Sequence, residues 1–148
     1  MSIEQVESLR QIHDAIPHRA PMLLVDEIVE QEEGSIVCRK TFRSDEFFVQ
    51  GHYPDHPIVP GVILTECGAQ TGAILLSGKV SADDGVPVLT KLDNVRFKNM
   101  VHPGQTVEMH VRLDDQVSNA YYMTAQIKCE GKTAARFSFV CSLAPAKK

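Results

Sequence analysis

The chain has 148 residues, and its composition of 43% hydrophobic and 23% charged residues is that of one soluble globular domain spanning residues 1–148. A net charge of -4 without any basic block argues against a nucleic-acid partner. No apolar run reaches membrane-spanning length, so we expect no membrane insertion either.

The N-terminal region predicts a helix followed by a β-hairpin. Apolar residues at helical spacing predict an amphipathic helix over Ser2–Ala15, which Pro17 and Pro21 close. This acidic segment does not resemble a signal peptide. Two strands are then predicted on either side of a short turn, at Met22–Gln31 and Ser35–Phe42.

The middle of the chain predicts a buried helix between two loops. Ser44–Pro60 is polar and rich in proline, which is typical of a loop. Gly61–Leu76 is apolar on nearly every side, which is the pattern of a helix buried all round. Gly78–Pro87 is expected to form the next loop.

The C-terminal part predicts an antiparallel sheet, because only short links separate four further apolar segments. The predicted strands are Val86–Met100, Thr106–Gln116, Asn119–Glu130 and Lys132–Leu143. A helix, two strands, a long helix and four strands in this order predict an α+β fold. In this fold a central helix is wrapped by an antiparallel sheet of about six strands.

The four cysteines are scattered along the chain and form no CxxC pair. This pattern indicates reduced thiols in a cytoplasmic protein rather than a disulfide framework. Cys67 is expected to pack in the core, since no histidine is placed by sequence to activate it as a nucleophile. The cysteines are Cys38, Cys67, Cys129 and Cys141.

The predicted loop before the long helix, and the start of that helix, hold the candidate chemistry. The loop prolines restrict the backbone and would keep His52 in a defined place. Free N–H groups at the helix start favour developing negative charge, and Gly61 would let a carbonyl approach closely. Glu66 lies in the second turn, with Gln70 one turn further on the same face. An imidazole, a carboxyl group and an anion-binding helix end suit proton removal next to a carbonyl, with the acid assisting a leaving group.

Each of these features also has a simpler interpretation. A histidine in a Gly/Pro loop is most often only a polar loop residue, and an acid near a helix start can simply complement the helix dipole. Proline before a helix is usually only a start signal. The spacing alone leaves catalytic and structural roles both open, and it names no substrate.

Three segments of the chain resemble the hallmark motifs of the FabZ-type β-hydroxyacyl-[acyl carrier protein] dehydratases. They are IPHRAPMLLVDEIVE, FFVQGHYPDHPIVPGVILTECGAQ and VRFKNMVHPGQTV, in the family's order and within roughly Ile16 to Leu143. In that family a GHFPxxPxxPG loop enters a buried helix that carries an acid. The histidine and the acid stand fourteen positions apart here, as they do in the family. The resemblance implies the hot-dog fold, with homodimers that assemble further into hexamers as trimers of dimers.

The resemblance also implies roles for individual residues. His52 matches the catalytic base and Glu66 its acid partner, and the family's dimers bring these two groups together across the interface. Gly61 matches the glycine whose N–H binds the thioester carbonyl; Val62 and a supporting Gln70 complete the expected substrate-binding residues. The implied reaction is dehydration of (3R)-hydroxyacyl-acyl carrier protein to the trans-2-enoyl product in fatty acid biosynthesis. Acyl carrier protein is the implied partner, and no cofactor or bound metal is expected.

Two other hot-dog functions compete with dehydration. A thioesterase would hydrolyse the thioester with a carboxylate and a water, without a histidine on the loop. A non-catalytic acyl-thioester-binding module would be free to lose either polar group, whereas both are present here. Some positions depart from the family pattern and would reshape the pocket, namely Asp55-His56, Thr65, Cys67 and Gly68.

Two sets of residues carry weaker signals. Lys91, Arg96 and Lys98 place positive charge along one predicted strand. They form either a solvated strand face or a docking patch for the acidic carrier protein. His18 lies in the PHR segment, which in the family positions the N-terminal region.

Overall fold

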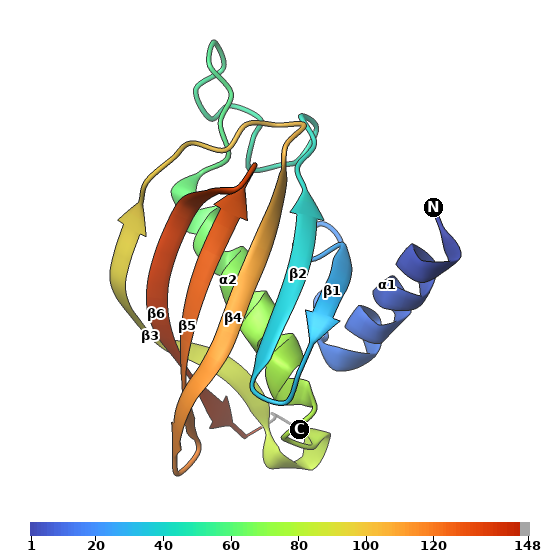
Figure 1. Cartoon of the computed structure of the whole chain (residues 1–148), viewed down its shortest axis with the longest axis vertical. Helices are drawn as coiled ribbons and strands as arrows, with labels where there is room; N and C mark the ends of the chain where they lie inside the picture. The colour runs from blue at the N-terminus through green and yellow to red at the C-terminus, as the bar shows by residue number, and fades with distance from the viewer. Residues whose placement is uncertain (146–148) are drawn as a thin grey trace.

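A computed structural model of the chain describes residues 1–145 (Figure 1). Its elements follow the predicted order of a helix, two strands, a long helix and four strands, with one short 3-10 turn before the third strand. They are α1 (Ile3–Ala15), β1 (Glu27–Gln31), β2 (Ser35–Thr41), α2 (Gly61–Ser77), η1 (Ala82–Asp84), β3 (Val86–Phe97), β4 (Thr106–Val117), β5 (Ala120–Cys129) and β6 (Lys132–Ala144).

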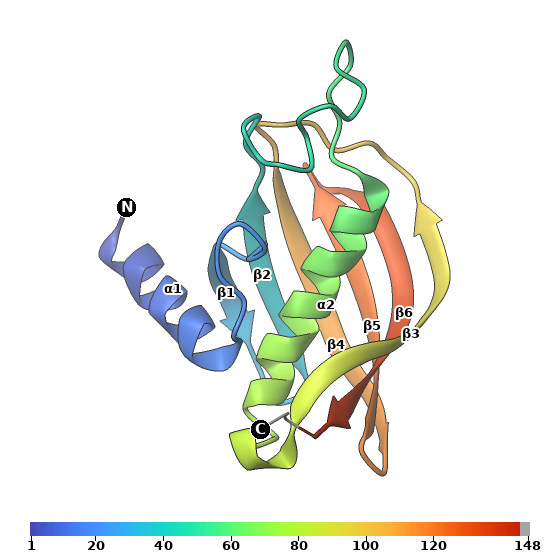
Figure 2. The same ribbon diagram turned by 180° about the vertical axis from the view of Figure 1, so that it is seen from behind.

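The six strands form one antiparallel sheet in the order β1-β2-β4-β5-β6-β3. The sheet curls around α2, which lies across its concave face, while α1 lies outside next to β1 (Figure 2). The sheet does not close, so β1 and β3 are its two edge strands. The predicted α+β hot-dog architecture, a long helix wrapped by a curled six-stranded sheet, is confirmed.

Local sequence accounts for the ends of several elements. Ser2 caps α1 in a capping box, because its hydroxyl accepts from the N–H of Gln5 and the Gln5 side chain accepts from the N–H of Ser2. At the β5–β6 hairpin, Glu130 and Gly131 have φ values of 52° and 78°. Positive φ at both central residues is the signature of the tight turns that suit the twist of paired strands.

The strand predicted over Met22–Gln31 is too long. β1 begins only at Glu27, with the N–H of Asp26 already paired to the carbonyl of Arg39 on β2, because the backbone at Met22 and Leu24 binds the α2 side chain Gln70 instead of a neighbouring strand. The N–H of Leu24 donates to Gln70 Oε1, and the carbonyl of Met22 accepts from Gln70 Nε2, both at 2.8 Å. A buried amide thus satisfies main-chain groups that a sheet would otherwise pair.

The prediction that the long helix is buried all round is wrong for its first turn. Val62 is 69% exposed, whereas from Leu64 onward most of α2 is buried. The first turn lies at one end of the curled sheet, close to where the strands give way to loops (Figure 2).

Glycines on α2 let the sheet approach the helix closely. A Cβ atom on Gly68 would lie 2.5 Å from Phe137 Cζ, and one on Gly72 would lie 2.8 Å from Phe139 Cζ. Both phenylalanines are 1% exposed, so neither ring has free space to move into. The small residues on α2 and the large ones on β6 therefore fit as complementary shapes.

Gly68→Ala should destabilise the protein by up to about 2 kcal/mol, with the 2.5 Å approach to Phe137 placing it toward the upper end. Overpacking a core typically costs ~1–3 kcal/mol, and alanine recovers only ~1 kcal/mol through its better helix propensity. Urea unfolding monitored by circular dichroism measures the difference. Gly34→Ala is the matched control, because a Cβ atom there would meet nothing within 4 Å. Equal midpoints for the two variants would contradict the close packing of α2 on β6.

Candidate active site

The loop between β2 and α2 positions His52. The tip of this loop stands clear of the sheet and of α2 in both views (Figure 1 and Figure 2). The backbone on either side of His52 has positive φ, 82° at Gly51 and 52° at Tyr53, so the chain turns sharply there. The His52 N–H donates to the carbonyl of Val49 at 3.1 Å. The imidazole therefore sits on a tightly folded turn.

A single contact decides which nitrogen of His52 carries the proton. Its Nδ1 lies 3.1 Å from the carbonyl oxygen of Ile58. A carbonyl oxygen can only accept a hydrogen bond, so Nδ1 is the protonated nitrogen of the neutral ring. Nε2 is left with a free lone pair, which is the form that a general base requires.

A buried ion pair anchors the start of the same loop. Lys40 Nζ lies 2.8 Å from Glu46 Oε1, and the two side chains are only 4% and 8% exposed. Glu46 Oε2 also accepts from the N–H of Arg43 at 2.9 Å, and the Glu46 carbonyl accepts from the N–H of Val49 at 3.0 Å. Because Val49 in turn accepts from His52, the pair supports the turn that holds the imidazole. Sequence reasoning missed this pair, although strand alternation with Cys38 turns Lys40 inward.

Glu46→Ala should destabilise the protein by about 3 kcal/mol, because it removes the nearer partner of the buried Lys40 charge and leaves only the half-exposed Asp26, whose Oδ1 lies 3.9 Å from Lys40 Nζ. Urea unfolding measures the effect, and Asp45→Ala serves as the matched control. Asp45 pairs with Arg43 on the surface and should leave the unfolding midpoint almost unchanged. Replacing both buried partners, as Lys40→Met with Glu46→Leu, should restore most of the lost stability. No recovery in the double variant would show that shape, rather than charge, dominates at this position.

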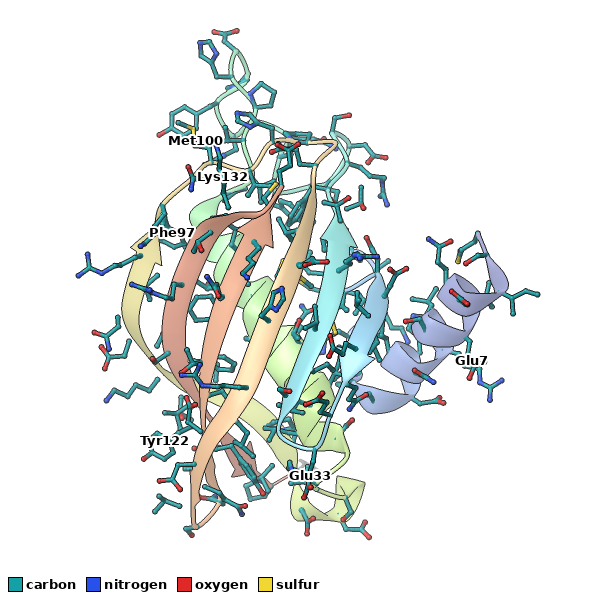
Figure 3. The ribbon with its side chains drawn as sticks, viewed as in Figure 1. Glu7, Glu33, Phe97, Met100, Tyr122 and Lys132 are labelled. Atoms are coloured by element: carbon teal, nitrogen blue, oxygen red, sulfur yellow. The ribbon has the colours of Figure 1, made fainter. Side chains whose placement is uncertain are left out.

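An open groove begins at the first turn of α2. It has a volume of about 830 Å³, and both Gly61 and Val62 line it. Apolar side chains, including Phe97 and Met100, form much of its wall, and Lys98 and Lys132 line it as well. Figure 3 shows Phe97, Met100 and Lys132 at the end of the sheet beside the start of α2.

Gly61 contributes to this groove through its backbone. A Cβ atom at this position would lie 3.0 Å from Phe97 Cε1, so a larger residue would crowd the groove wall. Pro60 caps α2 without a side-chain hydrogen bond, which leaves the N–H groups of Gly61 and Val62 available to an anion, while that of Ile63 donates to the carbonyl of Pro60 at 2.9 Å. A ligand in the groove can therefore meet both apolar surface and N–H donors.

Glu66 and Gln70 lie one helical turn apart and are in direct contact. Gln70 is 1% exposed, and its Nε2 donates to Glu66 Oε2 at 2.8 Å. The Glu66 side chain is 31% exposed, and its Oε2 also lies 4.0 Å from Nε2 of His18. Sequence reasoning gave His18 no part in the site. The only sequence feature that pointed to His18 was its place in the Pro17-His18-Arg19 motif.

The two predicted catalytic residues do not meet within one chain. Over residues 1–145, the only ion-pair partner of Glu66 is His18, while His52 contacts Ile58 and Tyr53 of its own loop. The Tyr53 ring packs edge-on against His52, with centroids 4.8 Å apart. The structure thus groups Glu66 with Gln70 and separately places Gly61 and Val62 in the groove.

The other predicted features have plain structural roles. Burial raises the pKa of the Cys67 thiol, and its side chain is 0% exposed, which confirms the prediction that it packs in the core. All four cysteines are free and buried. His56 is exposed in the loop, and His110 pairs with Glu108 at 3.2 Å on β4.

The part of the chain that the structure describes contains no group of three or more side chains able to hold a metal ion. Among the same residues, neither helix combines the length and the apolar character needed to cross a membrane.

Comparison with known proteins finds similarity over most of the chain. Residues 16–138 match a family model described as a FabA-like domain. The 3-hydroxyacyl-[acyl-carrier-protein] dehydratase FabZ of Clostridium perfringens (strain SM101 / Type A) is 37% identical over 127 residues, which cover 86% of this chain and 91% of the relative. The protein of the same name from Staphylococcus carnosus (strain TM300) is 38% identical over 133 residues, which cover 89% and 92% of the two chains.

Among solved structures, similarity extends to the dehydratase heterocomplex ApeI:P from Xenorhabdus doucetiae. The TM-score is 0.77 at 19% identity, and the match covers 90% of each chain. At this identity the likeness shows the fold alone.

Proposed function

Because the chain belongs to the FabZ-type β-hydroxyacyl-[acyl carrier protein] dehydratase family, as its three motifs predicted, we propose that it dehydrates (3R)-hydroxyacyl-acyl carrier protein in fatty acid biosynthesis. The product is the trans-2-enoyl thioester. The observation that supports this function for the present chain is the 3.1 Å contact between His52 Nδ1 and the carbonyl oxygen of Ile58. The His52 Nδ1–H donates to Ile58, so Nε2 is free to accept a proton.

In the proposed mechanism His52 Nε2 takes the proton from C2 of the substrate. The electrons of the broken C–H bond move toward the thioester carbonyl, whose oxygen gains negative charge beside the N–H of Gly61. The C2–C3 double bond then forms as the C3–O bond breaks. Glu66 gives its proton to the departing hydroxyl group, which leaves as water. The acyl chain lies along the apolar wall of the groove at Gly61 and Val62.

The reaction itself separates dehydration from its rivals. A short enoyl thioester incubated with the protein should lose its ultraviolet absorbance reversibly, because the dehydratase also catalyses hydration in the reverse direction. Release of a free thiol would instead identify a thioesterase, and no change in either signal would identify a binding module. Either of the last two results would overturn the proposed function.

We further propose that the protein works as a homodimer that pairs along β3, with hexamers built as trimers of dimers by resemblance to the family. β3 is an edge strand of 12 residues, and such edges invite pairing with another chain. Large apolar side chains remain exposed along it and on the neighbouring turn of α2. They are Val62, Val86, Val88, Leu89, Leu92 and Phe97. A second copy is the partner that would cover them.

The same dimer would complete the active site. Within residues 1–145, the hydrogen-bond and ring partners of His52 all belong to its own loop, which projects beyond the sheet, whereas Glu66 faces residues of its own α2 and N-terminal segment. A loop that reaches into a second chain would bring His52 to that chain's Glu66. Each dimer would then hold two shared sites.

Mixing inactive variants tests the shared site. His52→Ala and Glu66→Ala protomers, each nearly inactive alone, are unfolded and refolded together in equal amounts. Random pairing makes about half of the dimers mixed, each with one intact site, so activity should recover to roughly a quarter of the wild-type value. If mixed dimers form, as native mass spectrometry can establish, and the mixture stays inactive, then each site lies within one chain.

Acyl carrier protein is the proposed partner, and positive charge near the groove would attract this acidic protein. Lys91 is 3.8 Å from Asp93 and is therefore partly neutralised, whereas Lys98 lines the groove itself. Arg96 is exposed near the end of β3, the strand that also carries Lys91. Lys98 and Arg96 are thus the stronger docking candidates. A cytoplasmic location is part of the same proposal.

A further inference from the structure

The two carboxyl oxygens of Glu66 lie in different surroundings. Oε2 accepts a hydrogen bond from Gln70 Nε2 at 2.8 Å and lies 4.0 Å from His18 Nε2. Oε1 has no hydrogen-bond partner among residues 1–145. The proposed mechanism uses the carboxyl group as an acid, and these contacts bear on which oxygen delivers the proton.

The orientation of the Gln70 amide leaves no ambiguity about its donor. Its Oε1 accepts from the N–H of Leu24, and its Nε2 donates to the carbonyl of Met22 and to Glu66. A flipped amide would lose all three hydrogen bonds inside the protein. Oε2 of Glu66 therefore always faces an N–H group. In a protonated carboxyl group the carbonyl oxygen is the better acceptor, so the proton belongs on Oε1.

His18 is held in place from the backbone side. Arg19 Nη1 donates to the carbonyls of His18 and Ile16, at 2.7 Å and 3.0 Å. Its Nη2 donates to the carbonyl of His13 at 3.0 Å. The guanidinium group thus ties the His18 backbone to the end of α1, and the ring extends from there toward α2.

The surroundings of the His18 ring select one neutral tautomer. Its Nδ1 is buried and has no hydrogen-bond partner among the described residues, so a proton there would be a buried, unpaired donor. Its Nε2 faces Glu66 Oε2, an acceptor, which favours the proton on Nε2. The separation of 4.0 Å is too long for a hydrogen bond, but catalytic contacts are often long without substrate and tighten in the complex.

We infer that His18 is a positioning residue of the dehydration reaction, which acts with Gln70 by directing an N–H group at Glu66 Oε2. The two donors keep the transferable proton on Oε1, on the side that faces away from them. They also stabilise the negative charge that appears on the carboxylate once the proton has moved to the leaving hydroxyl group. This inference rests on the proposed role of Glu66 as the acid.

Two substitutions at His18 separate its N–H group from its bulk. Glutamine places an amide N–H close to the position of the imidazole Nε2, whereas asparagine is too short to reach it. His18→Asn should lower kcat by about 10- to 100-fold with KM changed by less than about threefold. His18→Gln should keep most of the wild-type kcat. His13→Asn on α1 is the matched control and should behave as wild type. Equal losses in His18→Asn and His18→Gln would overturn the inference.

A double-variant cycle tests whether His18 acts through Glu66. In a Glu66→Gln background there is no carboxyl proton to position, so His18→Asn should cause no further loss of residual activity. The same fold loss in both backgrounds would show an independent role and overturn the inference. Nitrogen-15 NMR of wild-type protein with labelled histidines measures the tautomer of His18 directly. This measurement does not depend on whether a variant folds. A proton on His18 Nδ1 would likewise overturn the inference.

The two proposals fail in distinguishable ways. Full turnover by Glu66→Gln would remove the acid from the proposed mechanism, and the role of His18 would fall with it. If the Glu66→Gln variant is inactive while the separate His18→Asn variant is as active as the His13→Asn control, only the role of His18 is removed from the mechanism. The proposed function would then stand.

Discussion

His52→Ala should lower turnover by about two to four orders of magnitude, which is the range for losing a positioned general base. The imidazole is oriented by the carbonyl of Ile58, and its free Nε2 is the proposed acceptor of the C2 proton. Steady-state hydration of an enoyl thioester measures the loss, with circular dichroism to show that the variant is folded. Near-wild-type turnover in a folded variant would remove His52 from the mechanism.

His56→Ala is the matched control for this loss. His56 lies four residues further along the same loop and carries the same side chain, but it is exposed and has no assigned role. Its replacement should cost less than about tenfold in turnover. A loss as large as that of His52→Ala would show that the wrong imidazole was chosen, or that both act.

Glu66→Gln should reduce dehydration by about two to four orders of magnitude while acyl binding persists. Glutamine preserves the shape of the side chain, and its carbonyl oxygen can still accept the hydrogen bond from Gln70 Nε2. Its amide cannot give a carboxyl proton to the departing hydroxyl group. The site should therefore stay assembled without being able to complete the elimination.

Titration with a non-hydrolysable acyl thioester analogue separates the two roles of Glu66. Wild type and Glu66→Gln should bind the analogue with similar affinity. Glu33→Gln, in the exposed β1–β2 turn, is the control that should leave both binding and turnover unchanged (Figure 3). If binding is lost together with activity, Glu66 holds the site together and its role as an acid has no support.

Local patterns in the sequence were sufficient to predict most of the fold. Periodicity of apolar residues depends on neighbours a few positions apart, and it located both helices and most of the strands to within a few residues. The same patterns wrongly extended the strand over Met22–Asp26, where the backbone of Met22 and Leu24 binds Gln70 on α2, a partner 46 to 48 positions away. No local pattern can report a contact at that separation.

Contacts between buried groups around the site were also beyond what local sequence patterns can predict. The sequence placed Lys40 on an inward-facing strand position but could not reveal Glu46 as its partner, because that pairing depends on how the loop folds back. It likewise left His18 in an N-terminal segment with no link to the acid on α2. Both contacts exist only after segments distant in the chain have packed together.

By itself, the sequence determined the family, the order of the elements and the residues that carry the proposed chemistry, because the motif fixes which side chains stand at which spacing. Only the tertiary structure decided what those side chains can do. The carbonyl of Ile58 selects the basic nitrogen of His52, and Gln70 distinguishes the two oxygens of Glu66. Protonation sites follow from hydrogen-bond partners, and long-range packing rather than local sequence supplies the partners of Glu66.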